Sequence, residues 1–231
     1  MGSGQMATLT RRRGLAHCTA LLLVAASGWS LDAAAALAAG PERVLVVGDS
    51  LSAEYGLARG TGWVALLEQR LAREGIAASV VNASISGDTT AGGRARLGAL
   101  LKQHRPTLVV LELGGNDALR GLPLAETKAN LAAMAQAAKA AGARVLVVGM
   151  RIPPNYGRQY GEQFAAVFAE VAREAGTALV PFMLKGVADA PDAERLFQPD
   201  RIHPVAAAHK TILENIWPVL APMLRSGAPA R

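Results

Sequence analysis

The sequence is poor in cysteine, with a single one, Cys18, among its 231 residues. This cysteine lies in an N-terminal stretch that has the features of a removable export signal. A chain without thiols forms no disulfide bonds and offers neither a cysteine nucleophile nor a thiolate ligand for a metal ion. The stability of the remaining chain must come from its hydrophobic core, and its chemistry from oxygen and nitrogen groups.

Aromatic residues are also scarce, at 4% of the chain, whereas hydrophobic residues of all kinds make up 51%. The core must therefore be built mainly from Ala, Val, Leu and Ile. The formal net charge is +6, but no run of Lys or Arg occurs after residue 40. Dispersed charge is typical of a solvated surface, so we predict no nucleic-acid partner and at most a transient contact with an anionic membrane surface.

Nucleotide-binding motifs are missing as well. No Gly-x-Gly-x-x-Gly segment follows the first predicted strand, and no Walker motif is present. Both motifs serve to cradle phosphate groups on backbone N–H groups, so their absence disfavours a nucleotide-binding protein. We predict no cofactor and no bound metal ion.

The first 38 residues have the three-part layout of a secretory signal peptide. Arginines at 11–13 precede an apolar stretch over 14–31 and a small-residue run over 33–39. Ala36-Leu37-Ala38 fits the small-x-small cleavage rule, so we place the cut near Ala38; loss of three arginines and one aspartate then leaves a charge of +4. We predict export to the periplasm, with secretion as the second choice. An uncleaved anchor is the alternative, because about 18 apolar residues can span a bilayer.

Short apolar runs recur along the remaining chain, each bounded by glycine, proline or polar residues. They lie at 44–47, 79–81, 108–113 and 145–150, with a weaker one at 178–181. Their length and their Val and Leu content are typical of strands that are buried on both faces of a sheet.

Helical periods separate these runs. Apolar residues recur at helical spacing around 63–71 and 164–171, while 89–103 and 124–141 are rich in Ala and Leu. A last helix is expected to begin at Pro204. The alternation predicts an α/β fold: a flavodoxin-like three-layer sandwich with a five-stranded parallel sheet and helices on both faces. We expect one domain over 39–225 and a flexible tail over 226–231.

Small polar residues follow several of the predicted strands. The segments are 48–52, 82–88 and 114–117, and a further polar segment, 200–204, lies late in the chain. In open parallel sheets, ligand sites form at the carboxyl ends of the strands, so these segments should meet at one edge.

These segments supply the groups of a serine hydrolase. Ser50 is the candidate nucleophile, His203 its base, and Asp200 the residue that orients the base. A serine hydroxyl attacks only when a base takes its proton, and an acidic residue fixes the tautomer of that base. His17 lies in the signal, His104 is expected at the surface, and His209 has no aspartate three residues before it.

An oxyanion also needs hydrogen-bond donors. We assign the backbone N–H of Ser50, the backbone N–H of Gly87 and the side-chain amide of Asn116 to this role. Each residue alone is weak support, since glycine and asparagine commonly shape turns, and Asp49 and Asp117 are expected mainly to hold loops. The joint occurrence of all five groups carries the prediction. A G-x-S-x-G elbow, which α/β-hydrolases use, is absent around Ser50.

The order Ser50, Gly87, Asn116 and His203, with Asp200 three residues before the histidine, resembles that of the SGNH hydrolases, also called GDSL esterases and lipases. The segments 47–52, 82–89 and 111–117 are similar to the bacterial periplasmic thioesterase I / protease I / lysophospholipase L1 group, as are 119–121 and 154–157. Arylesterases of the same group share these motifs. The resemblance covers the whole mature chain.

This resemblance implies a serine esterase or thioesterase that forms an acyl-enzyme on Ser50. Its substrates would be aryl esters, acyl-CoA thioesters or lysophospholipids, and we expect a monomer. The residues expected to contact the acyl group are Leu119 and Leu122, on a mobile loop over 118–123, and Pro154 and Tyr156. Two alternatives remain at this stage: a carbohydrate acetylesterase on the same fold, and a non-catalytic flavodoxin-like binding module.

Overall fold

Strands and helices alternate along the chain from residue 42 onward. The computed structural model describes residues 41–225, in which five strands form one sheet: β1 (Glu42–Gly48), β2 (Ala78–Asn82), β3 (Leu108–Glu112), β4 (Arg144–Val148) and β5 (Ala178–Val180). All neighbouring pairs are parallel, in the order β2-β1-β3-β4-β5. The predicted five-stranded parallel sheet is therefore confirmed. The predicted signal peptide, 1–38, and the tail, 226–231, lie outside the described residues.

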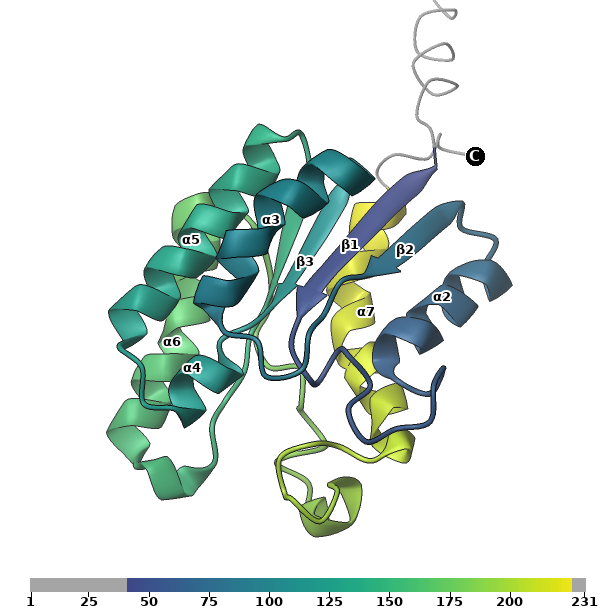
Figure 1. Ribbon diagram of the computed structural model, residues 1–231. Helices are drawn as coiled ribbons and strands as arrows, with labels where there is room; N and C mark the ends of the chain where they lie inside the picture. The colour runs from purple at the N-terminus through teal and green to yellow at the C-terminus, as the bar shows by residue number, and fades with distance from the viewer. Residues whose placement is uncertain (1–40, 226–231) are drawn as a thin grey trace, which may run out of the picture.

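Helices cover both faces of this sheet, as predicted (Figure 1). On one face α3 packs on α5, and α5 packs on α6, while α2 and α7 pack together on the other face. The bounds are α2 (Trp63–Arg73), α3 (Thr90–His104), α5 (Leu124–Ala140), α6 (Arg158–Ala175) and α7 (His209–Arg225). A short helix that the sequence analysis did not predict, α4 (Gly115–Leu119), follows β3 directly. No helix of residues 41–225 is both long and apolar enough to cross a membrane.

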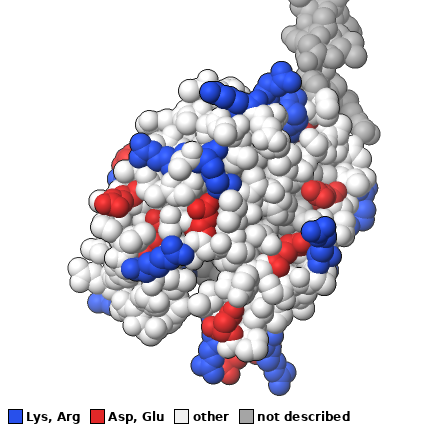
Figure 2. Space-filling model, in the orientation of Figure 1, with Lys and Arg blue, Asp and Glu red and all other residues white. Residues whose placement is uncertain are grey.

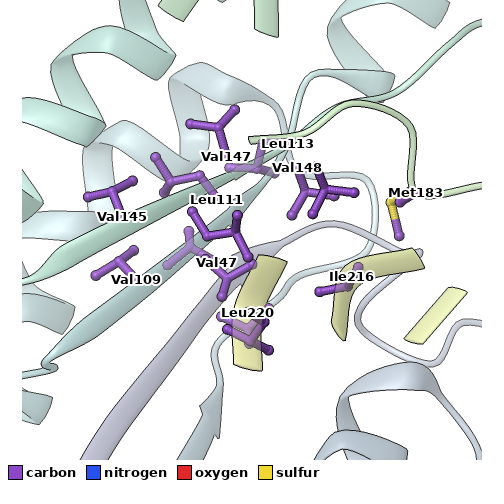
Figure 3. Packing of buried hydrophobic residues seen from close by; sticks show 14 of the residues in the cluster. Val47, Val109, Leu111, Leu113, Val145, Val147, Val148, Met183, Ile216 and Leu220 are labelled. Atoms are coloured by element: carbon purple, nitrogen blue, oxygen red, sulfur yellow. The ribbon is translucent and has the colours of Figure 1, made fainter. Parts of the chain in front are cut away.

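The core is built from aliphatic side chains of the three central strands and from the helices that cover them. Val47 of β1, Leu111 of β3 and Val147 of β4 are register partners, and Figure 3 shows them with Ile216 and Leu220 of α7, which belong to the same buried cluster. β3 is buried at all five positions. The prediction of burial on both faces is wrong for β2, which has exposed residues because it is an edge strand with no neighbour beyond it.

The segment before α7 also differs from the prediction. The last helix begins at His209, and Pro204 instead forms an antiparallel bridge with Phe197. The N–H of Gln198 donates to the carbonyl of His203, and the N–H of Val205 donates to the carbonyl of Leu196. This pairing keeps residues 203–205 extended, so the helix starts later. The resulting hairpin carries residues 199–202 and His203 toward the carboxyl edge of the sheet.

Candidate active site

Ser50 lies in a tight turn that follows β1. The N–H groups of Ser52 and Ala53 both donate to the carbonyl of Asp49, at 3.2 and 2.9 Å, and the N–H of Leu51 donates to Oδ1 of the Asp49 side chain at 3.0 Å. Asp49 thus holds the turn through backbone hydrogen bonds, as the sequence analysis expected. The turn presents the Ser50 side chain, which is half-buried, at the edge of the sheet.

The hydroxyl of Ser50, the ring of His203 and the carboxylate of Asp200 form a hydrogen-bonded line. Ser50 Oγ lies 2.8 Å from His203 Nε2, and His203 Nδ1 lies 2.6 Å from Asp200 Oδ2. Ser50 comes from the β1–α2 loop and the other two from the hairpin before α7, so the sequence separation is bridged by the fold. This geometry is suited to a serine nucleophile with its base and its orienting acid.

Asp200 is held in place by more than the histidine ring. Its Oδ1 accepts the N–H of Ile202 at 2.9 Å and the N–H of His203 at 3.0 Å. Partial desolvation raises the pKa of this carboxyl, but the two backbone N–H groups and the His203 side chain outweigh that effect and lower the pKa to about 2. Asp200 is therefore ionised across the neutral range and ready to stabilise an imidazolium on His203.

Tyr55 packs on the ring of His203, a contact that the sequence analysis missed. The two ring centroids are 4.4 Å apart with an interplanar angle of 39°. Tyr55 is nevertheless half exposed, so one part of its ring covers the imidazole while the rest meets solvent. The side chain of Gln198, in the hairpin, donates to the Tyr55 carbonyl at 2.9 Å and ties the two loops together. No local pattern could reveal this contact, because it joins residues far apart in the sequence.

The three predicted oxyanion donors lie in the segments that follow β2, β1 and β3, which are adjacent strands; Gly87 and Ser50 are in loops and Asn116 is in α4. Asn116 links the three segments: its Nδ2 donates to the carbonyl of Asp88 at 3.0 Å and to Asp49 Oδ2 at 3.2 Å. Asp88 and Asp49 are the sequence neighbours of Gly87 and Ser50. Within residues 41–225, neither the Ser50 N–H nor the Gly87 N–H donates to a protein acceptor. Asn116 is thus hydrogen-bonded to the sequence neighbours of both Ser50 and Gly87, and the three groups are of the kinds that an oxyanion hole uses.

The loop over 118–123 contacts the loop that carries Gly87. The guanidinium of Arg120 donates to the Gly87 carbonyl at 2.8 Å. Asp117, at the start of this loop, is buried. Its carboxylate accepts two hydrogen bonds from Thr90, one from the backbone N–H at 2.9 Å and one from the hydroxyl at 2.5 Å. Asp117 thus has the loop-holding contacts that the sequence analysis expected of it, because it fastens α4 to the start of α3.

We expect Gly87→Ala to lower kcat by about 10-fold, because a small displacement of a reacting geometry is costly. Gly87 has a φ of +80°, which a residue with a Cβ adopts at a cost of about 1–2 kcal/mol. Gly142, with a φ of +83°, lies in the α5–β4 loop, and a Cβ there would meet nothing within 4 Å. Gly142→Ala is therefore the matched control: denaturant unfolding should show a similar loss of stability in both variants, with kcat lowered only in Gly87→Ala. Equal kcat values in the two variants would contradict the prediction that the backbone conformation at residue 87 sets the geometry of the oxyanion hole.

Burial makes Asp49 an unusual acid. Removal from solvent raises its pKa to about 6, and the hydrogen bonds from Leu51 and Asn116 counteract only part of that shift. A raised native pKa means that the neutral form is favoured in the folded state. The stabilising contribution of Asp49 is therefore complete below its unfolded value of 3.8 and is lost as the pH rises through about 6.

We expect Asp49→Asn to change how stability depends on pH. Consider the stability difference, defined as the free energy of unfolding of the unmodified protein minus that of the variant. We expect this difference to be larger at pH 4 than at pH 8 by about 2–3 kcal/mol. Urea unfolding of both proteins at the two pH values measures this difference. The exposed Asp192→Asn controls for the loss of one acidic residue. A difference that does not vary with pH would mean that Asp49 titrates normally in the fold.

An apolar pocket of about 360 Å³ opens beside the hairpin that carries Asp200 and His203, which we call the catalytic hairpin. Its walls come from the loop after β4, the segment after β5 and the hairpin, and they include Ile152, Pro153, Pro154, Phe182, Phe197 and Ile202. Of the residues expected to contact an acyl group, Pro154 lines this pocket, whereas Leu119, Leu122 and Tyr156 do not. The sequence analysis did not single out Phe182 and Ile202, although Ile202 stands between Asp200 and His203 and could have been found by that position.

Metal ligands are not gathered in the described part of the chain. Within residues 41–225, no group of three or more His, Cys, Asp or Glu side chains is arranged to hold a metal ion. The polar side chains at the carboxyl edge are instead engaged with each other and with backbone groups, as described for Asp49, Asn116 and Asp200.

Comparisons with known proteins point to one family. Residues 46–211 match the GDSL-like lipase/acylhydrolase family. The chain is 55% identical over 186 residues to esterase TesA of Pseudomonas aeruginosa, covering 80% of this chain and 91% of that protein. It is 43% identical over 187 residues to thioesterase 1/protease 1/lysophospholipase L1 of Escherichia coli, covering 81% and 87%. A crystal structure of TesA superimposes with a TM-score of 0.76 at 55% identity, over 79% of this chain and 99% of that one.

Proposed function

The chain belongs to the GDSL-like lipase/acylhydrolase family, the SGNH hydrolases, and from this membership we propose that it hydrolyses acyl esters through an acyl-enzyme on Ser50. The observation that carries the proposal is the line from Ser50 Oγ through His203 to Asp200, with contacts of 2.8 and 2.6 Å. A non-catalytic binding module has no use for such a line. The protein is thus a serine esterase of the SGNH class.

Acylation follows from the geometry. Ser50 Oγ attacks the carbonyl carbon of the ester while its proton passes to Nε2 of His203. Asp200, which is ionised, stabilises the imidazolium and keeps the second ring proton on Nδ1. The negative oxygen of the tetrahedral intermediate is received by the N–H groups of Ser50 and Gly87 and by the amide of Asn116. His203 then returns the proton to the leaving alcohol or thiol as the bond to it breaks.

Deacylation repeats these steps with water. His203 takes a proton from a water molecule, which attacks the acyl carbon, and the bond to Ser50 Oγ breaks. The proton returns to Ser50 Oγ and the free carboxylic acid leaves. In both steps, one N–H of the Asn116 amide must leave its contact with Asp88 or Asp49 and donate to the oxyanion instead.

We propose that the substrates are esters with an extended apolar part: aryl esters, acyl-CoA thioesters and lysophospholipids. The support is the pocket formed in part by the hairpin that carries Asp200 and His203, whose walls carry Ile152, Phe182 and Ile202. The relative from Escherichia coli bears the names thioesterase and lysophospholipase, in agreement with this class. A carbohydrate acetylesterase on the same fold would need a cleft for a polar sugar ring, and the apolar walls disfavour it.

A series of p-nitrophenyl esters of increasing acyl length tests this substrate class. We expect kcat/KM to rise beyond the acetyl ester, because each methylene buried in the pocket contributes about 0.8 kcal/mol. Acetylated xylan, measured in parallel, should be a poor substrate. A protein that hydrolyses the acetyl ester and acetylxylan but fails on longer acyl chains would be the acetylesterase.

We further propose that the carboxyl edge contacts lipid surfaces transiently. The four exposed large hydrophobic residues of the described chain are Tyr55, Ile85, Tyr156 and Ile202. All four lie on loops after β1, β2 and β4 or on the catalytic hairpin, around the same edge as Ser50. Charged side chains of both signs are interspersed on the face in Figure 2, which suits brief rather than tight binding. Sedimentation with phosphatidylcholine vesicles, compared with Ile85→Ser, would measure the contact.

Export and assembly state belong to the same proposal. The layout of residues 1–38 supports export to the periplasm, and we propose that the mature protein acts there as a monomer. Fractionation of cells that produce the full chain, with mass determination of its mature N-terminus, tests both the location and the cut near Ala38. Light scattering on the purified protein tests the monomer.

A further inference from the structure

Glu112, the last residue of β3, is a buried acid that the mechanism does not use. It is fully buried, and its Oε2 accepts the hydroxyl of Ser52 at 2.5 Å and the N–H of Asp49 at 3.3 Å. These two donors stand on either side of Ser50 in the turn after β1. A single oxygen atom from the neighbouring strand therefore fastens the nucleophile turn from beneath.

The second carboxyl oxygen of Glu112, Oε1, lowers the stability of the fold. Glu112 Oε1 is buried and has no hydrogen-bond partner among residues 41–225. Burial, and then the nearby Asp49, raise the pKa of Glu112 well above its usual value. A buried polar atom without a partner lowers stability, and an apolar side chain would avoid that loss.

The neighbouring strand β1 leaves space for the Glu112 carboxyl by having a glycine, Gly48, at its last position. A Cβ at Gly48, the last residue of β1, would lie 2.6 Å from Glu112 Oε2 and 2.8 Å from Ser52 Oγ. Only glycine leaves room for the carboxyl. Ser52 Oγ in turn accepts the indole N–H of Trp63 at 3.1 Å, and Trp63 is fully buried in α2. The turn is thus joined through Ser52 to both the sheet and a core helix.

We propose that Glu112 is a positioning residue that holds Ser50 Oγ at its working distance from His203. This inference rests on the proposed esterase function. Glu112 acts as the acceptor for Asp49 N–H and for the Ser52 hydroxyl, and these two bonds fix the turn on both sides of the nucleophile. Because the carboxyl does not touch the substrate, its loss should slow the chemical step and leave substrate binding unchanged.

The test compares Glu112→Met, which keeps the bulk and removes the acceptor, with Glu112→Gln, which keeps a neutral acceptor oxygen. We expect Glu112→Met to lower kcat on a p-nitrophenyl ester by about 10- to 100-fold with KM unchanged, because a misplaced nucleophile reacts slowly. The inactivation rate by a fluorophosphonate probe should fall to the same degree. Glu112→Gln should stay within about 3-fold of the unmodified protein, and both variants should remain folded.

Thr177→Val is the matched control. Thr177 Oγ1 is also buried without a partner among the described residues, but it lies just before β5, at the opposite end of the sheet from Ser50. Its removal should leave kcat and KM unchanged. Loss of activity in Thr177→Val equal to that in Glu112→Met would overturn the proposal, because the effect would then be a general response to altered packing.

Further outcomes also decide against it. A normal kcat for Glu112→Met would overturn the positioning role, and an equal loss in Glu112→Gln would show that an acceptor oxygen at this position is not what holds the turn. If Glu112→Met does not fold, Ser52→Ala replaces it, with kcat expected to fall by about 3- to 10-fold at constant KM; a normal kcat there has the same meaning. An unmodified protein that neither hydrolyses esters nor reacts with the probe would instead refute the proposed function itself.

Discussion

Replacing Ser50 with alanine should abolish ester hydrolysis, lowering kcat by about 10⁶-fold, the loss typical when a serine nucleophile is removed. The substitution deletes only Oγ, whose hydrogen bond is to His203 Nε2. The turn itself is held by the backbone and by Asp49, so the variant should fold normally. Initial rates on p-nitrophenyl butyrate, together with mass spectrometry after fluorophosphonate treatment, measure the effect. The unmodified protein should gain one adduct on Ser50, and Ser50→Ala none.

The control for this prediction is Ser79→Ala, which removes the same hydroxyl from an exposed position on β2. Its rates and its labelling should match those of the unmodified protein. Appreciable turnover by purified Ser50→Ala, at a melting temperature equal to that of Ser79→Ala, would rule out an acyl-enzyme on this serine. A general-base mechanism with direct attack by water would then have to be considered.

Replacing Asp200 with asparagine should lower kcat by about 10³- to 10⁴-fold, although the two side chains have almost the same shape. Asp200 Oδ1 accepts hydrogen bonds from the N–H groups of Ile202 and His203. In the variant, only the amide oxygen of the asparagine can accept these two bonds, so it should occupy the Oδ1 position. Its NH₂ group is then turned toward Nδ1 of His203. To accept a hydrogen bond from this NH₂ group, Nδ1 must be unprotonated, so the ring proton is on Nε2 instead. A protonated Nε2 can no longer take the proton of Ser50.

Steady-state kinetics on the same ester measure this loss, with Asp192→Asn as the control. Asp192 is exposed and precedes the hairpin, so its replacement changes the net charge equally without touching His203. KM should change little in Asp200→Asn, because the carboxylate acts through the histidine. A kcat within 10-fold of the unmodified value would leave Asp200 as a residue that only shapes the hairpin.

Much of the fold followed from the sequence because parallel strands carry their own signal. β1, β3 and β4 each contain four consecutive apolar residues, as is typical of strands that helices cover on both faces. The edge strand β2 follows a weaker pattern, and its exposure was not predicted. The start of α7 was misplaced because proline commonly opens a helix, whereas Pro204 is held extended by its bridge to Phe197. That bridge joins two segments whose pairing is not encoded in local propensity.

The residues that line the apolar pocket were only partly predicted. Pro154 and Tyr156, after β4, were expected to contact the acyl group; Pro154 lines the pocket together with its neighbours Ile152 and Pro153, whereas Tyr156 does not. Phe182, from the segment after β5, lines it too, and nothing in its own neighbourhood in the sequence indicates that. Leu119 and Leu122 lie outside the pocket, on the loop that Arg120 ties to Gly87. Which apolar residues face a cavity depends on how loops pack, and this is a property of the assembled fold.

The sequence by itself determined the candidate nucleophile, base and orienting acid, because Ser50, Asp200 and His203 stand in short polar segments with a recognisable order. It also determined the family and the reaction type, since an oxyanion hole and a triad need only a few residue types at strand ends. Only the tertiary structure decided what supports Ser50: the ring of Tyr55 on His203, and Glu112 beneath the turn. These contacts join residues tens of positions apart, and a distance between side chains exists only once the chain has folded.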